Sequence, residues 1–115
     1  MADIPGRGDV VWLSMDPAQG HEQRGHRPHL VLSDERLART MGLVIAVPMT
    51  SSHRPWATRV EMAPGSYAIG EQPRTVSTAR ITKTDHTSYD VEPVVRVINT
   101  LIGVGSATPN DTNLS

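Results

Sequence analysis

The chain has 115 residues and a formal net charge of -1, so it is not the strongly basic protein that binding to duplex DNA usually requires. It contains no cysteine, which excludes disulfides, thiolate catalysis and thiolate metal sites and fits a reducing compartment. No segment approaches the run of about 18 apolar residues that a membrane-spanning helix needs, so we expect one domain in the cytoplasm, with no membrane partner.

Apolar patterning predicts six short β-strands. The run DVVWLSM at residues 9–15 is apolar at nearly every position, as in a strand that is covered on both faces. Residues 57–62 instead alternate apolar and charged side chains, which is typical of a half-buried strand. The predicted strands are residues 9–15, 29–33, 43–50, 57–62, 67–69 and 75–81. Pro28 lies at the start of the second of these strands, where no hydrogen bond to a neighbouring strand is required of it.

Polar segments and helix signals separate these strands. Residues 16–26 are polar and include proline and glycine, which predicts a long loop. A short helical turn is expected over residues 34–39, capped by Ser33 or Asp34 and ending near Gly42. Asp90 is the expected N-cap of a C-terminal amphipathic helix that ends before Gly103 and packs on the sheet. The apolar residues of that helix are Val94, Val97, Ile98 and Leu101. Together these elements predict an antiparallel α+β barrel or half-open roll.

Arg27 is the first candidate for chemistry, because it lies where the polar loop meets the second strand. A guanidinium presents a planar fork of donors that suits phosphate oxygens, and it stays charged at physiological pH. On composition alone, a surface ion pair with Glu22 or Asp34 is the simpler interpretation. Basic residues outnumber acidic ones between residues 20 and 60, which permits a basic face on a nearly neutral protein.

Hydroxyl and imidazole groups supply further candidates. Thr50 begins a run of three hydroxyl side chains at the end of an apolar strand, a pattern that ordinary strand termination also explains. His26 and His53 could act as an acid and base pair in RNA cleavage, although loop histidines more often have no such role. His21, His26 and His29 lack a zinc-binding spacing such as HExxH, and no nucleotide-binding glycine motif is present. We therefore expect no metal and no cofactor.

Several segments, in this order and at this spacing, closely resemble the MazF/PemK family of toxin endoribonucleases. They are residues 8–13 (GDVVWL), 16–17, 20, 22–23, 25–28 (GHRP), 30–33 (LVLS), 47–50 (VPMT), 71–76 (EQPRTV) and 98–103 (INTLIG). Each piece alone is a weak signal, whereas their order and spacing over residues 8–103 form a strong one.

The resemblance implies an SH3-like antiparallel barrel of the MazF/CcdB type, formed by residues 1–103. Residues 104–115 are small and polar, so we expect them to form a disordered tail. The resemblance also implies a cytoplasmic homodimer that cleaves single-stranded RNA, including mRNA, at short specific sequences and is inhibited by a MazE-like antitoxin protein. In such a reaction the RNA 2′-hydroxyl attacks the adjacent phosphorus without a metal, leaving a 2′,3′-cyclic phosphate and a 5′-hydroxyl.

The catalytic residues of the family map onto Arg27 and Thr50. A fixed guanidinium and a hydroxyl donor would stabilise the charge that builds on the phosphate oxygens. Arginine is a poor proton acceptor, so the general base stays open between Glu22 and His26. The residues expected to contact RNA are Gln23, Ser51, His53 and Arg74.

Two departures from the family pattern affect base preference. Pro73 replaces a strand hydrophobe, which should break a hydrogen bond to the neighbouring strand, and residues 82–92 form a short approach to the terminal helix.

Two other function classes compete with the nuclease. A CcdB-like gyrase-poisoning toxin lacks nuclease activity, and the presence of both Arg27 and Thr50 argues against it. A noncatalytic SH3-like adaptor needs an aromatic groove, which is hard to build from 3% aromatic residues.

Overall fold

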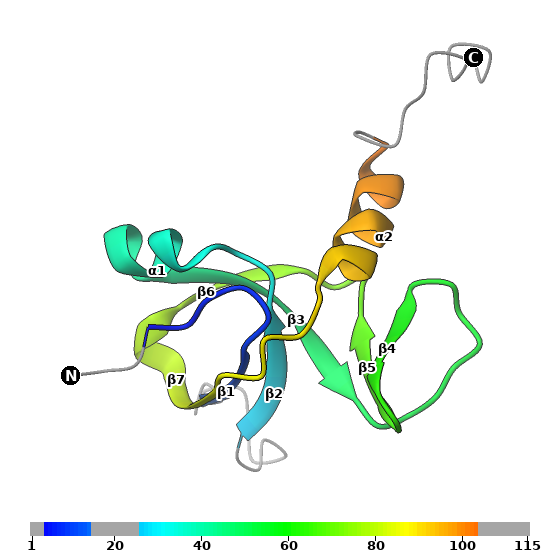
Figure 1. Cartoon of the computed structure of the whole chain (residues 1–115), viewed down its shortest axis with the longest axis horizontal. Coiled ribbons are helices and arrows are strands. Elements are labelled where there is room, and N and C mark those ends of the chain that lie inside the picture. Colours follow the sequence, from blue (N-terminus) through cyan, green and yellow to red (C-terminus); the bar gives the residue numbers. More distant parts are fainter. Residues whose placement is uncertain (1–3, 15–25, 104–115) are drawn as a thin grey trace.

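A computed structural model describes residues 4–14 and 26–103, in which seven antiparallel strands form one curved sheet with two helices (Figure 1). The strands are β1 (Val10–Ser14), β2 (His26–Val31), β3 (Leu43–Thr50), β4 (Arg59–Ala63), β5 (Ser66–Ile69), β6 (Arg74–Ser77) and β7 (Ile81–Asp85), and the helices are α1 (Glu35–Met41) and α2 (Glu92–Ile102). Their order across the sheet is β4-β5-β3-β2-β1-β7, with β6 paired to β3. The loop expected at 16–26, apart from its last residue, and the tail expected at 104–115 lie outside the described residues.

The expected mainly β, antiparallel α+β architecture is confirmed. Its sheet is open rather than closed, because β4 and β7 form its two ends and no pairing between them exists among the described strands. The half-open roll is therefore the more accurate of the two expected forms.

Strand β3 holds the two halves of the core together, and its predicted bounds are confirmed. Along one edge it pairs with β2, and along the other it pairs first with β6 and then with β5. Val44 packs into a cluster with Val11 and Leu13, whereas Val47 packs into a second cluster with Leu30. Most positions of this strand are buried because it lies between neighbouring strands on both of its edges.

Strand β2 begins three residues earlier than the predicted strand 29–33 and ends at Val31. Pro28 therefore lies inside the strand, opposite Trp12 of β1, rather than at its start. The pairing of β2 with β3 begins only at His29, opposite Pro48. At Pro28, β2 therefore pairs with β1 but not with β3. A proline without an N–H is tolerated at such an edge position.

The predicted strand 75–81 is wrong, because a 3-10 turn divides this segment into β6 and the start of β7. The Ser77 hydroxyl accepts a hydrogen bond from the Ala79 N–H, and the chain turns from β3 to pair with β1. The expected effect of Pro73 is also wrong. Pro73 directly precedes Arg74, the first residue of β6, so it costs no hydrogen bond within the sheet.

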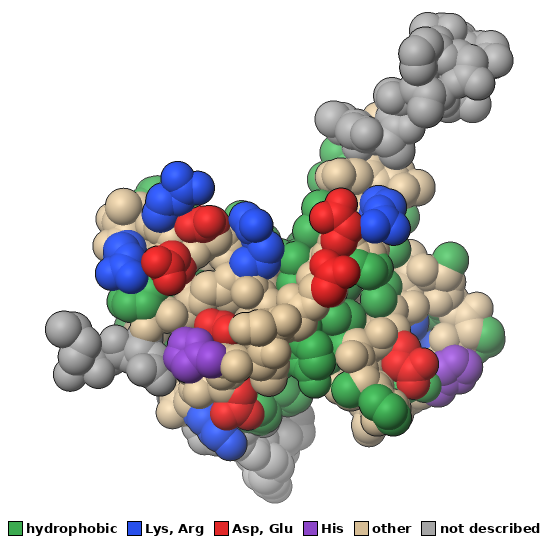
Figure 2. All heavy atoms as spheres, in the orientation of Figure 1, with side chains coloured by type: hydrophobic (Ala, Val, Ile, Leu, Met, Phe, Trp, Pro, Cys, Tyr) green, Lys and Arg blue, Asp and Glu red, His purple; other side chains and the backbone are tan. Residues whose placement is uncertain are grey.

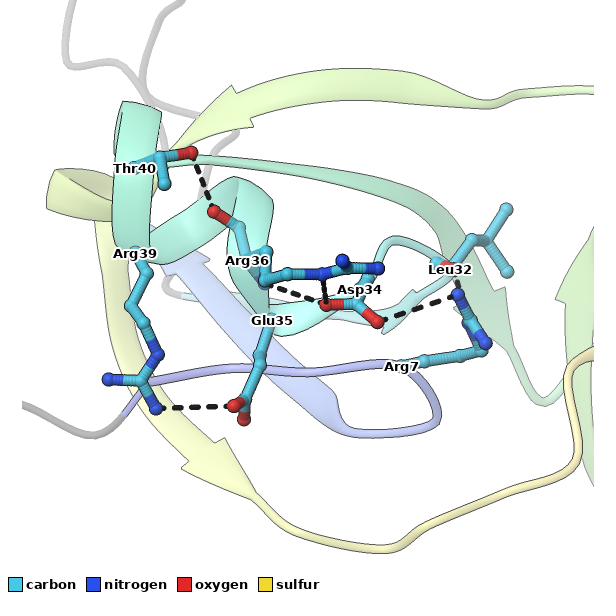
Figure 3. Close-up of polar contacts among 7 residues, drawn as sticks. All are labelled: Arg7, Leu32, Asp34, Glu35, Arg36, Arg39 and Thr40. Atoms are coloured by element: carbon cyan, nitrogen blue, oxygen red, sulfur yellow. Dashed lines mark hydrogen bonds and ion pairs between the residues drawn. The ribbon is translucent and has the colours of Figure 1, made fainter.

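Helix α1 forms where its capping residues predicted it. The Asp34 carboxylate accepts a hydrogen bond from the Arg36 backbone N–H, and Gly42 ends the helix in the left-handed conformation. The same carboxylate pairs with the Arg36 guanidinium at 3.0 Å, and Glu35 pairs with Arg39 at 3.2 Å (Figure 3). Figure 2 accordingly shows the two signs of charge interleaved over this helix. These arginines belong to no basic face.

Helix α2 is confirmed, but its N-cap is Val91 rather than the predicted Asp90, and only its first half packs on the sheet. The Asp90 carboxylate accepts a hydrogen bond from the Glu92 N–H, and Val94 is fully buried. Leu101 and Ile102 are 55% and 66% exposed, because the helix rises away from the sheet (Figure 1). Neither this helix nor α1 has the length and apolar character needed to span a bilayer.

Candidate active site

Three arginines that are distant in sequence converge on one small pocket between the first strands of the sheet. The pocket has a volume of about 120 Å³ and is lined by Leu13, Arg27, His29, Pro48, Gln72, Arg74 and Arg80. It combines a strongly cationic wall with apolar surface, which suits a nucleic-acid ligand.

Two larger hollows near the N-terminal segment are less suited to RNA. One, of about 320 Å³, is lined mainly by threonines and apolar residues together with Lys83. The other, of about 400 Å³, has three carboxylates in its walls, Asp9, Asp34 and Glu35, against one arginine, Arg7, and this excess of carboxylates would repel a phosphate backbone. Charge rather than size therefore identifies the arginine-lined pocket as the candidate site.

Arg27 lies in β2 opposite Leu13 of β1, and its side chain is exposed at the pocket. The following residue, Pro28, restricts the Arg27 backbone to extended conformations. The carbonyl oxygen of Arg27 is 3.1 Å from Nδ1 of His29. A regular strand therefore fixes the backbone that carries the guanidinium, while the guanidinium itself stays accessible to a ligand.

Thr50 ends β3, opposite Tyr67 of β5, and is partly exposed. Its Oγ1 accepts a hydrogen bond from the Ser52 backbone N–H at 3.0 Å, so the hydroxyl hydrogen can be donated elsewhere. His29 of β2 pairs with Pro48 of the antiparallel strand β3. Arg27 lies two residues before His29 and Thr50 lies two residues after Pro48, so each is on the same face of its strand as that paired residue. The two predicted catalytic residues thus occur at the same end of the β2 and β3 pair.

The other predicted site residues fall into three groups. Arg74 begins β6 and lines the pocket with Arg27. Ser51 and His53 are exposed in the loop after β3, where the His53 ring packs 5.1 Å from the Tyr67 ring. Glu22 and Gln23 lie outside the described residues, and only the backbone of His26, the first residue of β2, is described.

Sequence reasoning missed three polar pocket residues, His29, Gln72 and Arg80. The Arg80 guanidinium donates a hydrogen bond to the Ser14 carbonyl at 2.9 Å, which holds it beside the end of β1. No sequence signal marked Arg80, because the turn that places it was predicted as strand. His29 could have been found, since strand alternation puts it on the same face as Arg27.

His29 is a buried neutral histidine. Burial is the main cause that lowers its pKa, and the nearby Arg74, Arg27 and Arg80 lower it further, against an opposing effect of the Arg27 carbonyl. A carbonyl oxygen can only accept, so Nδ1 carries the proton and donates it there. Nε2 is then an acceptor, and it has no hydrogen-bond partner among the described residues. Leaving such a group unpaired costs about 1–3 kcal/mol.

The buried neutral imidazole predicts a specific pH dependence of stability. The unfolded chain binds a proton at His29 more readily than the folded chain, because the pKa of His29 is lowered in the folded state. The contribution of neutral His29 to the free energy of unfolding is therefore complete above the ordinary pKa of 6.5. It is lost as the pH falls from 6.5 through the lowered folded-state pKa. We expect the free energy of unfolding to fall more steeply from about pH 7 to pH 5 in the wild type than in His29→Gln. Urea denaturation across this range measures the difference, and parallel curves would show that the imidazole is not buried in neutral form.

A protein-family model matches residues 6–102, which include Arg27, Thr50 and the arginine-lined pocket. Its description is "PemK-like, MazF-like toxin of type II toxin-antitoxin system". The chain belongs to this family. The gyrase-poisoning alternative is accordingly not favoured.

Curated relatives of this PemK/MazF family member match over part of their length. The endoribonuclease toxin MazF of Escherichia coli K12 is 35% identical over 60 residues, which are 52% of this chain and 54% of the relative. The endoribonuclease toxin ChpB of the same organism is 47% identical over 45 residues, which are 38% of each chain. The chain thus spans about half the length or less of these two relatives.

Solved structures of the family share the whole fold. A MazE-MazF structure from Deinococcus radiodurans has a TM-score of 0.76 and 26% identity, and the match covers 90% of this chain and 100% of that one. An endoribonuclease in complex with its cognate antitoxin, from a mycobacterial species, has a TM-score of 0.67 and 21% identity over 90% of this chain and 99% of that one. The second likeness supports the fold alone.

Proposed function

We propose that this chain is the toxin of a toxin-antitoxin pair and cleaves single-stranded RNA at short specific sequences. One observation carries the proposal. The two residues that match the catalytic residues of the family, Arg27 and Thr50, lie at the same end of β2 and β3, where Arg27 lines the cationic pocket. The relatives named endoribonuclease support the same activity.

In the proposed reaction the ribose 2′-oxygen forms a bond to the adjacent phosphorus while the bond from phosphorus to the 5′-oxygen breaks. A base takes the 2′-hydroxyl proton, with Glu22 and His26 as the candidates, and the departing 5′-oxygen takes up a proton from solvent. The Arg27 guanidinium and the Thr50 hydroxyl donate hydrogen bonds to the non-bridging oxygens, on which negative charge increases. The products are a 2′,3′-cyclic phosphate and a 5′-hydroxyl, and the scheme requires no metal or cofactor.

The proposed assembly is a homodimer that a MazE-like antitoxin silences. Solved structures that share the fold include complexes of MazF with MazE and of an endoribonuclease with its cognate antitoxin. We propose that an antitoxin segment covers the arginine-lined pocket, since a carboxylate-bearing peptide would compete with phosphate for Arg27, Arg74 and Arg80.

The purified protein, tested in EDTA on a long unstructured RNA, is expected to cut at discrete sites. Direct labelling of the products by polynucleotide kinase would show the 5′-hydroxyl ends, and a single-stranded DNA of the same sequence should persist because it lacks the 2′-hydroxyl. Cleavage only after magnesium is restored would overturn the metal-free reaction. Inhibition of gyrase with intact RNA would overturn the nuclease altogether.

A further inference from the structure

One of the two tryptophans of the chain lies in an exposed loop, whereas the other packs on the core. Trp56 is 52% exposed in the segment between β3 and β4, where residues 51–57 are all exposed. Trp12 is partly buried and packs against the core cluster that contains Leu30. In Figure 1 the loop of Trp56 projects from the end of the sheet that β4 and β5 form. The reaction proposed above gives this large exposed ring no role.

Two arginines hold their guanidinium groups against the Trp56 indole. The Arg59 Cζ lies 5.2 Å from the ring centroid, and the Arg54 Cζ lies 5.8 Å from it. Residues 51–60 contain no acid, and the Glu61 carboxylate accepts a hydrogen bond from the backbone N–H of Gly65, in the turn between β4 and β5. An exposed aromatic ring beside two cations, in a loop without carboxylates, is typical of surfaces that bind single-stranded nucleic acids.

A series of short contacts connects this ring to the candidate catalytic threonine. Thr50 Oγ1 accepts a hydrogen bond from the Ser52 N–H at 3.0 Å, and the Ser52 carbonyl accepts one from Arg59 Nη1 at 2.9 Å. The Arg59 backbone N–H donates in turn to the Trp56 carbonyl at 3.0 Å. These bonds tie the two ends of the loop together, so the indole is held close to the end of β3 at which Thr50 lies.

The ring is accessible to a ligand because the two guanidinium groups cover it only in part. Arg59 is half-buried and fixed by its bond to Ser52, whereas Arg54 is exposed and lies at the longer distance. A planar base can therefore replace Arg54 on the indole, and the released guanidinium can pair with a neighbouring phosphate. Arg59 keeps its contact with the ring and adds positive charge beside the bound strand.

On the basis of the proposed ribonuclease function, we propose that Trp56 is a stacking platform for an unpaired base of the RNA that flanks the cleaved bond. Every base has a flat π-face, so stacking of this kind does not distinguish strongly among the four bases. Trp56 contributes affinity and places the strand at Thr50, while the choice of sequence belongs to other contacts. A duplex keeps its bases stacked on one another and offers no base to the ring, which fits a single-stranded substrate.

The first test combines a change in the protein with a change in the ligand. Trp56→Ala should weaken binding of a 2′-fluoro oligonucleotide, which cannot react through its 2′-oxygen, by about tenfold or more. Trp56→Phe keeps an aromatic face and should lose much less, and Arg36→Ala, in the exposed ion pair of α1, should bind like the wild type. Trp56 is an exposed loop residue, so both of its variants should fold.

Oligonucleotides that lack the base at one position in turn complete this test. At one position the missing base should weaken binding to the wild type, and Trp56→Ala should then cause no further loss, because the stacked pair is already gone. A purely structural role of Trp56 would instead add the same loss to every oligonucleotide. Additive losses at all positions, or wild-type affinity in Trp56→Ala, would overturn the proposal.

Tryptophan fluorescence reports the same contact directly, because Trp12 and Trp56 are the two tryptophans of the chain. Binding of the oligonucleotide should quench the emission of the wild type, since a stacked base contacts the excited indole. It should leave the emission of Trp56→Phe nearly unchanged, although that variant still binds. Equal quenching in the two proteins would show that the base does not contact Trp56 and would contradict the assignment.

These binding measurements separate the inference from the proposed function. Stacking on Trp56 without any cleavage of RNA would leave the platform in place and remove only the nuclease. Cleavage of RNA with wild-type affinity and wild-type kcat/KM in Trp56→Ala would leave the nuclease and remove only the platform. A protein that binds no single-stranded oligonucleotide would overturn both.

Discussion

Replacing Arg27 by alanine is expected to lower the rate of RNA cleavage by about 10²-fold or more, the usual cost of removing one donor that stabilises developing charge. The substitution removes the guanidinium at the mouth of the pocket but leaves the backbone of β2 paired with β1. Its side chain is exposed, so the free energy of unfolding should change by less than about 0.5 kcal/mol. Single-turnover cleavage of a defined RNA, together with urea denaturation, measures both quantities.

Two further variants make the Arg27 result specific. Arg27→Lys keeps the positive charge but loses the planar fork that binds two phosphate oxygens, so we expect activity between those of the wild type and Arg27→Ala. Arg36→Ala removes another exposed guanidinium, which pairs with Asp34 outside the pocket, and it should cleave like the wild type. Normal cleavage by a folded Arg27→Ala protein would remove this residue from the active site.

The elements that sequence patterning located correctly are those with strong local signals. β3 is a continuous apolar run because it is buried along most of its length, and α1 begins and ends at capping residues, Asp34 and Gly42. β7 was missed except at its first residue, Ile81, because it is an end strand of the sheet with exposed Thr82 and Lys83. Such a strand is defined by its pairing with β1, and that long-range contact leaves no periodic pattern in the sequence.

The candidate site was predictable only in part, for a related reason. Resemblance to the family identified Arg27 and Thr50, and the register of β2 and β3 places them at the same end of this strand pair. The count of basic residues between 20 and 60 was misleading, since Arg36 pairs within α1, whereas Arg74 and Arg80 come from later segments. Which charges converge on a pocket depends on the folded topology rather than on their separation along the chain.

Replacing Thr50 by valine is expected to lower the cleavage rate by about 10²-fold, since it removes a hydroxyl donor and keeps the β-branched shape. In the folded chain Oγ1 already accepts from the Ser52 N–H, so the hydroxyl hydrogen is directed away from that group. This geometry suits donation to a phosphate oxygen. Single-turnover kinetics with saturating RNA separate a loss of chemistry from a loss of binding.

The matched variant Thr50→Ser retains the hydroxyl and should recover most of the wild-type rate. Both variants should unfold within about 0.5 kcal/mol of the wild type, because Thr50 is partly exposed and water can replace it as the partner of the exposed Ser52 N–H. If Thr50→Val cleaves like the wild type and Thr50→Ser does not, the methyl group rather than the hydroxyl matters. Thr50 would then pack against the substrate, and stabilisation of the phosphate charge would fall to the arginines alone.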